Sequence, residues 1–382
     1  MPSFSAPGSA HPPDGLSDGE LTAALDGDRP LVLGDAELAA PGTGARGLAR
    51  ALGAAALVPT SGSTSGVPRV VALTTANLRA SANATHERLG GAGAWLLTVP
   101  DTHVAGLMVR VRAHLAGTPV VHADGPFRPE GLVAGVRRLA AVAPGGRRYV
   151  SLVPTQLRRV LADPAATEAL ATFDAVLVGG AATPPPLLDA AHAAGVRAVT
   201  TYGMTETAGG CVYDGEPLRG VDIRLGADQR VLIDAPQVAL GYVARGALEP
   251  FDGTFATADR GLVTDGRLRV LGRLDDVLVS GGVNVDPAQV EAVVAGLDGV
   301  AEVAVVGVPD PEWGQAVVAV VVPTTPTPGD RSDLAEAVRA VVRSSLPPGW
   351  VPRRVVVRDS LPLRGPGKID RRGLAAELAD PA

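Results

Sequence analysis

Cysteine is nearly absent from this chain of 382 residues, because Cys211 is its only one. A lone cysteine excludes an intramolecular disulfide and a cysteine-based metal cage, and it fits the reducing cytoplasm, where we expect the protein to act. Lysine is also scarce, whereas alanine, glycine and valine are abundant and arginine supplies nearly all of the basic side chains. This bias is typical of a GC-rich genome, so arginine in place of lysine carries little functional meaning by itself.

Positive charge is in deficit as well, because the net charge is -6 at pH 7. This balance argues against a nucleic-acid partner held by charge. Long apolar runs are missing: the longest, from Ala316 to Val322, is far too short to cross a bilayer, so we expect no membrane insertion. No basic segment followed by an apolar one stands at the N-terminus, and the sequence therefore predicts no signal peptide.

The chain is long enough for two domains, because 382 residues exceed one ordinary hydrophobic core. Alternating strands and helices predict an α/β fold: a large N-terminal domain with mainly parallel, helix-flanked sheets. Short strands and turns from Val221 to Val243 add a small β subdomain. A compact α+β pattern follows residues 273–276, so we predict an N-terminal domain over 1–272 and a small C-terminal domain over 277–382. Residues 1–20, rich in proline, glycine and serine, are expected to be poorly ordered.

Hydroxyls and glycines are concentrated in the segment Thr60-Ser61-Gly62-Ser63-Thr64-Ser65-Gly66-Val67-Pro68-Arg69, between two apolar runs. A Gly/Ser/Thr loop between strands can turn several N–H groups and hydroxyls onto one anion, because glycine permits the φ values such a nest needs. No Gly-Lys-Ser/Thr closes the loop, so it is not a Walker A motif. Taken alone, the segment predicts either a polyphosphate site or a solvated turn.

Two glycine-rich turns, at Gly179 and Gly203, follow strands of the predicted parallel sheet, at the edge where such sheets bind ligands. Beside the second turn, Glu206 could hold Mg²⁺ together with substrate phosphates, or it could pair with a surface arginine. Further on, Asp259 could accept the hydroxyls of a ribose, or it could form an Asx-turn. His103, at a strand-to-helix junction, could line a pocket or be exposed.

The order of the motifs decides between these alternatives. A hydroxyl-rich glycine loop, Gly-Gly-Ala, Tyr-Gly-Met-Thr-Glu, Thr-x-Asp, Gly-Arg-x-Asp-Asp and Pro-x-x-x-x-Gly-Lys-Ile-Asp follow one another. From about Leu57 to the C-terminus this resembles the adenylate-forming superfamily of acyl-CoA synthetases, adenylation domains and luciferases. The segments Thr102 to Leu107 and Thr201 to Pro217 are most similar to its actinobacterial o-succinylbenzoate–CoA ligases of menaquinone biosynthesis.

The resemblance implies a role for each matching residue. The β- and γ-phosphates of ATP would be bound by the loop Thr60, Ser61, Gly62, Ser63, Thr64, Ser65 and Gly66 with Arg69, the α-phosphate would contact Thr205, and Glu206 would bind Mg²⁺. Gly180 and Ala181 would border the adenine, on which Tyr202 would stack next to Gly203, while Asp259 would hold the ribose and Arg273 would reach the ribose or phosphate. Lys368 would be the catalytic lysine, His103 would line the acyl pocket, and Ser280, Gly281 and Gly282 would face the pantetheine of CoA. Asp275 would be the hinge of a mobile C-terminal domain.

The implied reaction joins a small carboxylic acid to a thiol with ATP, Mg²⁺ and coenzyme A, through an acyl-adenylate, in a protein compatible with a homodimer. If the acid carries a second carboxylate, Arg110 or Arg112 is the expected partner. The sequence departs from the family pattern where Ser65 is inserted and Arg69 replaces lysine, and its N-terminal region is short. Alternatives are another aryl or acyl acid, loading of a carrier protein, or nucleotide binding without turnover. Lys368, Glu206 and Asp275 together argue against the last.

Overall fold

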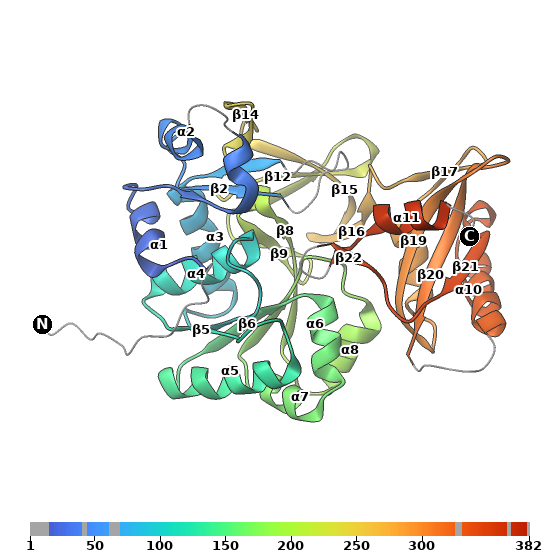
Figure 1. Cartoon of the computed structure of the whole chain (residues 1–382), viewed down its shortest axis with the longest axis horizontal. Coiled ribbons are helices and arrows are strands. Elements are labelled where there is room, and N and C mark those ends of the chain that lie inside the picture. The colour runs from blue at the N-terminus through green and yellow to red at the C-terminus, as the bar shows by residue number, and fades with distance from the viewer. Residues whose placement is uncertain (1–14, 40–43, 61–68, 325–330, 365–367, 380–382) are drawn as a thin grey trace, which may run out of the picture.

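The computed structural model describes residues 15–39, 44–60, 69–324, 331–364 and 368–379. Figure 1 shows a large N-terminal part, coloured blue to yellow, beside a smaller C-terminal part in orange and red. The predicted α/β class with a large and a small part is confirmed. The first part ends with β16 (Arg267–Arg273) and the second begins with β17 (Leu278–Ser280). The domain limits 272, 273–276 and 277 stay a prediction.

The largest sheet carries the parallel strands that the sequence predicts. Its order is β10-β9-β8-β7-β6-β4-β5, with β4 (Ala94–Leu97), β5 (Val120–His122), β6 (Arg148–Leu152), β7 (Ala175–Val178), β8 (Ala198–Met204), β9 (Gly209–Tyr213) and β10 (Glu216–Pro217). From β5 to β8 all pairs are parallel. The helices that follow these strands are α4 (Val104–Ala116), α5 (Pro129–Val142), α6 (Pro154–Leu161), α7 (Pro164–Ala171) and α8 (Pro185–Ala193). Because helices cover such a sheet, the apolar run of β7 is buried at every position.

The glycine-rich segment at Gly203 is a strand and not a turn. β8 continues through it to Met204 and pairs in antiparallel register with β9, while the one-turn helix η2 (Thr205–Thr207) joins the two strands. A Cβ added at Gly203 would lie 2.1 Å from the carbonyl oxygen of Gly209. Glycine is therefore needed here for the close approach of two strands, which a sequence pattern cannot separate from a turn.

A second sheet frames the hydroxyl-rich loop. Its order is β1-β2-β3-β13-β14, with β1 (Leu31–Val32), β2 (Ala56–Pro59), β3 (Val70–Leu73), β13 (Gly241–Ala244) and β14 (Ala247–Pro250). Only the β1–β2 pair is parallel, so parallel pairing is concentrated in the larger sheet. Its neighbours are α1 (Asp18–Leu25), η1 (Gly34–Ala39), α2 (Ala45–Ala51) and α3 (Thr75–Arg88). Residues 61–66, predicted to bind phosphate, lie outside the described residues.

Regular secondary structure begins nearer the N-terminus than the sequence predicts. Residues 18–20, expected to belong to a poorly ordered terminus, form the first turn of α1. Ser17 caps this helix in a capping box with Glu20, whose pKa is lowered by hydrogen bonds from Ser17. The backbone N–H of the buried Leu16 donates to Asp101. Composition alone does not reveal such a long-range anchor.

The predicted small β subdomain is an antiparallel sheet of β11 (Asp222–Leu225), β12 (Arg230–Asp234), β15 (Thr254–Thr264) and β16, with η3 (Ala227–Gln229) between β11 and β12. Its register pairs Asp259 on β15 with Arg273 on β16. Two residues that are distant in the sequence and bear predicted functions are thus neighbours across one strand pair.

The C-terminal part packs helices on a third large sheet. It contains β17, β18 (Val283–Val285), β19 (Val300–Asp310), β20 (Gly314–Pro323), β21 (Arg354–Val357), α9 (Pro287–Val294), α10 (Arg331–Ser345), η4 (Pro348–Trp350), the hairpin β22 (Leu363–Arg364) and β23 (Lys368–Ile369), and α11 (Arg371–Ala379). An ion pair between Arg371 and Glu291 ties α11 to α9 at 2.6 Å. In the described ranges, no helix has the length and apolar character needed to cross a membrane.

Candidate functional site

A cavity of about 680 Å³ lies among the sheets of the N-terminal part. Its wall includes residues from both large sheets and from the antiparallel subdomain. The predicted site residues that line it are Thr60, Arg69, His103, Gly180, Gly203, Thr205, Glu206, Asp259 and Arg273. Segments that lie far apart in the sequence therefore meet around one space, large enough for a nucleotide-sized ligand.

Other predicted site residues are not part of this wall. They are Ala181, Tyr202, Asp275, Ser280, Gly281 and Gly282. Gly281 and Gly282 form the turn between β17 and β18, with φ values of 56° and 78°, and Ser280 is buried beside them. Lys368 is described by its backbone alone, at the start of β23 opposite Arg364 of β22.

Asp259 is held by a local network. The buried Thr257 hydroxyl accepts from the Asp259 backbone N–H at 3.0 Å, which explains the Thr-x-Asp spacing. Tyr202 donates its hydroxyl to Asp259 Oδ2 at 2.7 Å. Burial, followed by the Asp259 charge, raises the pKa of Tyr202 far above its ordinary value, so the phenol remains a donor. Tyr202 thus orients this carboxylate.

Arg273 links Asp259 to the predicted hinge. Its guanidinium makes a bidentate contact with Asp275, at 2.8 and 2.7 Å, and one nitrogen lies 3.7 Å from Asp259 Oδ1. A planar guanidinium suits this fork geometry and also phosphate oxygens. Arg273 therefore stands between the cavity and the segment that joins the two parts of the chain.

Glu206 occupies the middle of η2 and is 8% exposed. Tyr242 of β13 donates its hydroxyl to Glu206 Oε1 at 2.6 Å. Within the described ranges, the Glu206 carboxylate makes no other hydrogen bond, and no group of three His, Cys, Asp or Glu side chains could hold a metal alone. A single carboxylate fits Mg²⁺ that takes most of its oxygens from phosphates and water.

Thr60 and Arg69 close the base of the hydroxyl-rich loop. The N–H of Thr60 donates to the Arg69 carbonyl at 2.7 Å, and the Arg69 N–H donates to the Thr60 hydroxyl at 3.1 Å. The Arg69 guanidinium lies 4.2 Å from the centroid of the Tyr242 ring. The positive charge that ends the loop is thereby directed to the same part of the cavity as Glu206.

The two arginines of α4 have different surroundings. Arg110 is paired with Asp18 at 2.5 Å and with Asp101 at 3.5 Å, away from the cavity wall. Arg112 lines the cavity, is 3% exposed, and makes no hydrogen bond within the described residues. Burial lowers the pKa of Arg112, and its guanidinium lies 5.3 Å from the Trp95 ring. Arg112 is therefore a buried cation without a partner charge that faces the cavity.

His103 is the N-cap residue that precedes α4, and it lines the cavity. The preceding loop lies directly on the helix, because a Cβ at Gly106 would come within 2.3 Å of the Pro100 carbonyl oxygen. Glycine at position 106 therefore permits this close contact between the loop and α4 at the junction that carries His103.

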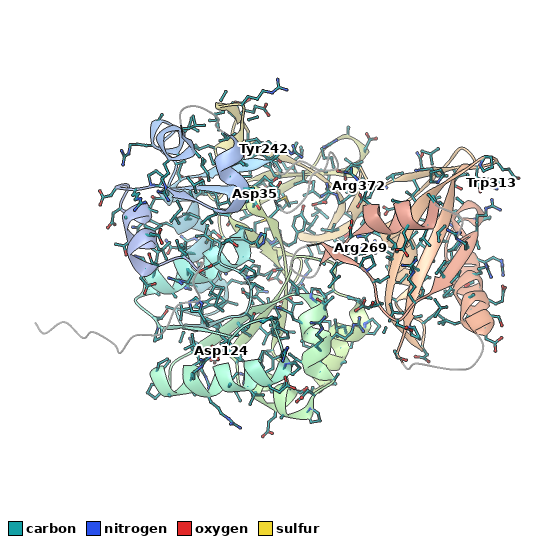
Figure 2. The ribbon with its side chains drawn as sticks, in the orientation of Figure 1. Asp35, Asp124, Tyr242, Arg269, Trp313 and Arg372 are labelled. Carbon is teal, nitrogen blue, oxygen red and sulfur yellow. The ribbon has the colours of Figure 1, made fainter. Side chains whose placement is uncertain are left out.

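Sequence reasoning missed Tyr242. Tyr242 belongs to none of the motifs and lies in an ordinary apolar strand pattern. The pairing of β13 with β3 is what brings it to Glu206. No signal in the sequence could have found it. Figure 2 shows Tyr242 in the N-terminal part and Trp313 at the far end of the C-terminal part.

Two family models match the chain. The model of the AMP-binding enzymes covers residues 28–236, and the model of the AMP-binding enzyme C-terminal domain covers residues 289–368. The first matched range includes the cavity residues from Thr60 to Glu206, and the second ends at Lys368.

Individual proteins are similar over most of the chain. A probable 2-succinylbenzoate–CoA ligase of Mycobacterium tuberculosis is 46% identical over 334 residues, covering 86% of this chain and 85% of its own. A 2-succinylbenzoate–CoA ligase of Salmonella typhimurium is 37% identical, covering 82% of this chain and 67% of its own. Among solved structures, o-succinylbenzoate coenzyme A synthetase from Bacillus subtilis, in complex with ATP and magnesium ion, has a TM-score of 0.68 and 27% identity, covering 84% of this chain and 70% of its own.

Proposed function

Because the chain belongs to the AMP-binding enzyme family, we propose that it is an ATP-dependent acid–CoA ligase that acts on 2-succinylbenzoate in the cytoplasm. The observation that carries this proposal is the shared cavity of Glu206, Asp259, Arg273 and Arg112. Its first three residues have the chemistry that a metal-bound nucleotide needs, and the fourth suits an acid with a second negative charge. The relatives named above support the choice of acid.

The proposed reaction has two steps in one site. A carboxylate oxygen of the acid attacks the α-phosphorus of ATP, the bond to pyrophosphate breaks, and an acyl-adenylate remains. The thiol of coenzyme A then loses its proton to solvent and its sulfur attacks the acyl carbon, the bond from that carbon to the phosphate oxygen breaks, and AMP leaves. Both reactants of the first step are anionic, so the site must neutralise charge before they meet.

Each proposed site residue of this chain has its own role in the reaction. Asp259, oriented by Tyr202, would accept the ribose hydroxyls, and Thr205 and Arg273 would contact the phosphate that reacts. Glu206 would hold Mg²⁺, which supplies charge neutralisation on the phosphates when bound. Lys368 would stabilise charge on the phosphoryl oxygens. Ser280, Gly281 and Gly282 would approach the pantetheine in the second step.

Arg112 is the residue that we propose for the second carboxylate of the acid. A buried guanidinium without a partner charge is costly, and an anionic group that enters the cavity removes this cost. Arg110 is less suited to this role because Asp18 and Asp101 already pair with it. An aromatic acid with two carboxylates, such as 2-succinylbenzoate, thus offers one carboxylate to react with ATP and a second to pair with Arg112.

A pyrophosphate-release screen tests the proposal. Aryl and acyl acids are offered one at a time with ATP and Mg²⁺, with and without coenzyme A. We expect release with 2-succinylbenzoate and a thioester only when coenzyme A is added. Release with another acid, or transfer only to a carrier protein, would reassign the substrate, whereas ATP binding without release would exclude an acid ligase.

A further inference from the structure

Tyr242 contacts two residues that the phosphate chemistry requires. Its hydroxyl donates to Glu206 Oε1 at 2.6 Å, and its ring lies under the Arg69 guanidinium at 4.2 Å. Phe251 packs edge-on against the same ring, with centroids 4.8 Å apart. One side chain therefore contacts both the carboxylate expected to hold the metal and the cation that ends the phosphate loop.

The backbone around Tyr242 is fixed on both sides. β13 is an interior strand, in which Tyr242 lies opposite Val71 of β3 and Glu249 of β14. The main chain of Glu206 is held by the same segment, because the Ala239 N–H donates to the Glu206 carbonyl at 2.9 Å. Residues 239–242 thus hold both the backbone and the side chain of Glu206, although Glu206 lies in η2 and Tyr242 in β13.

The hydrogen bond has one direction, because a carboxylate oxygen accepts and the phenol O–H donates. Oε1 accepts this bond, and among the described residues Oε2 accepts none, so Oε2 is the oxygen left for a cation. A hydrogen bond from a neighbour that orients a metal-ligating carboxylate is a common feature of metal sites.

We propose that Tyr242 is a positioning residue for metal binding: its hydroxyl orients Glu206 for a divalent cation, and its ring positions Arg69 beside it. This inference rests on the proposed function, in which Glu206 holds Mg²⁺ with the phosphates of ATP. Tyr242 touches no reacting atom and acts only through these neighbours.

Tyr242→Phe removes the hydroxyl and keeps the ring, so it tests the hydrogen bond alone. We expect the Mg²⁺ concentration for half-maximal acid-dependent pyrophosphate release to rise by about tenfold to a hundredfold, the usual effect of losing such a partner. The KM for the acid should not change. The matched control is Tyr149→Phe, which removes a buried hydroxyl that donates to Leu89 and Gly91, away from the cavity.

A binding measurement separates this inference from the proposed function. Mn²⁺ is titrated into the full chain with α,β-methylene ATP and followed by electron paramagnetic resonance, which needs no turnover. We expect weaker Mn²⁺ binding in Tyr242→Phe and unchanged binding in Tyr149→Phe. Equal metal dependence in Tyr242→Phe and the unmodified protein would overturn the inference, as would an equal loss in both variants. Failure of the unmodified protein to release pyrophosphate with any acid would overturn the proposed function alone.

Discussion

At the scale of single residues, the two arginines of α4 differ in whether an acidic side chain pairs with them. They lie two positions apart and are equally buried, yet only Arg112 faces the cavity and has no ion pair among the described residues. The sequence names both as candidates because a helix with unknown neighbours does not show which side meets a ligand. The ion pairs of Arg110 with Asp18 and Asp101 favour Arg112 as the candidate.

Replacing Arg112 tests its role directly. We expect Arg112→Gln to raise the KM for 2-succinylbenzoate by about tenfold or more, the effect of losing a charge-assisted hydrogen bond. The KM for ATP, and the KM for an aromatic acid that lacks the second carboxylate, should stay unchanged in steady-state pyrophosphate assays. An equal rise in KM for both acids would show that Arg112 shapes the cavity and does not bind the second carboxylate.

At the scale of secondary-structure elements, the short hairpin of β22 and β23 carries the predicted catalytic lysine. Lys368 is the single lysine of the chain and starts β23, directly before α11. The pair of Arg371 with the largely buried Glu291 fixes the start of α11 on α9. The hairpin is thus tied to the C-terminal part, so movement of that part would carry Lys368 with it.

We expect Lys368→Ala to leave ATP binding nearly intact and to slow adenylate formation by on the order of a hundredfold or more. Thioester formation from supplied acyl-adenylate should remain, because the lysine serves the first step. Quenched-flow measurement of each half-reaction checks this, with Lys368→Arg as the charge-retaining control. Undiminished acid-dependent pyrophosphate release by the alanine variant would refute the assignment.

Elements also show where sequence reasoning succeeds and fails. Motif order identifies Glu206, Asp259 and Arg273 because their local spacing, such as Thr-x-Asp, has a local hydrogen-bond cause. Motif order does not reveal Tyr242, whose position depends on the pairing of β13 with β3, a strand far away in the sequence. It also does not reveal the strand at Gly203, which depends on the chain turning back so that β8 pairs with β9. Local patterns thus predict the cavity residues better than they predict the residues that orient them.

At the scale of the whole molecule, the segment around Asp275 joins the two parts. Arg273 holds Asp275 in a bidentate contact and approaches Asp259, so the connection is linked to the predicted ribose site. A second contact joins Arg260 of β15 to Asp286, the N-cap of α9, at 3.5 Å. We expect a reaction with two steps in one cavity to require rearrangement about this segment.

Asp275→Pro should slow thioester formation by about tenfold more than adenylation, because proline restricts φ where the backbone must turn. Asp275→Ala is the control, since it removes the carboxylate but keeps the backbone freedom. The rates of both half-reactions are compared in single turnovers. Equal slowing of the two steps would argue against a hinge at this residue.

The proposed function requires this molecule to form an acyl-adenylate and then a thioester. The most direct measurement incubates the protein with ATP, Mg²⁺ and 2-succinylbenzoate without coenzyme A and identifies the bound products by mass spectrometry. We predict 2-succinylbenzoyl-adenylate on the protein, with conversion to the coenzyme A thioester and AMP once coenzyme A is added. Bound ATP with no adenylate would contradict the proposed function.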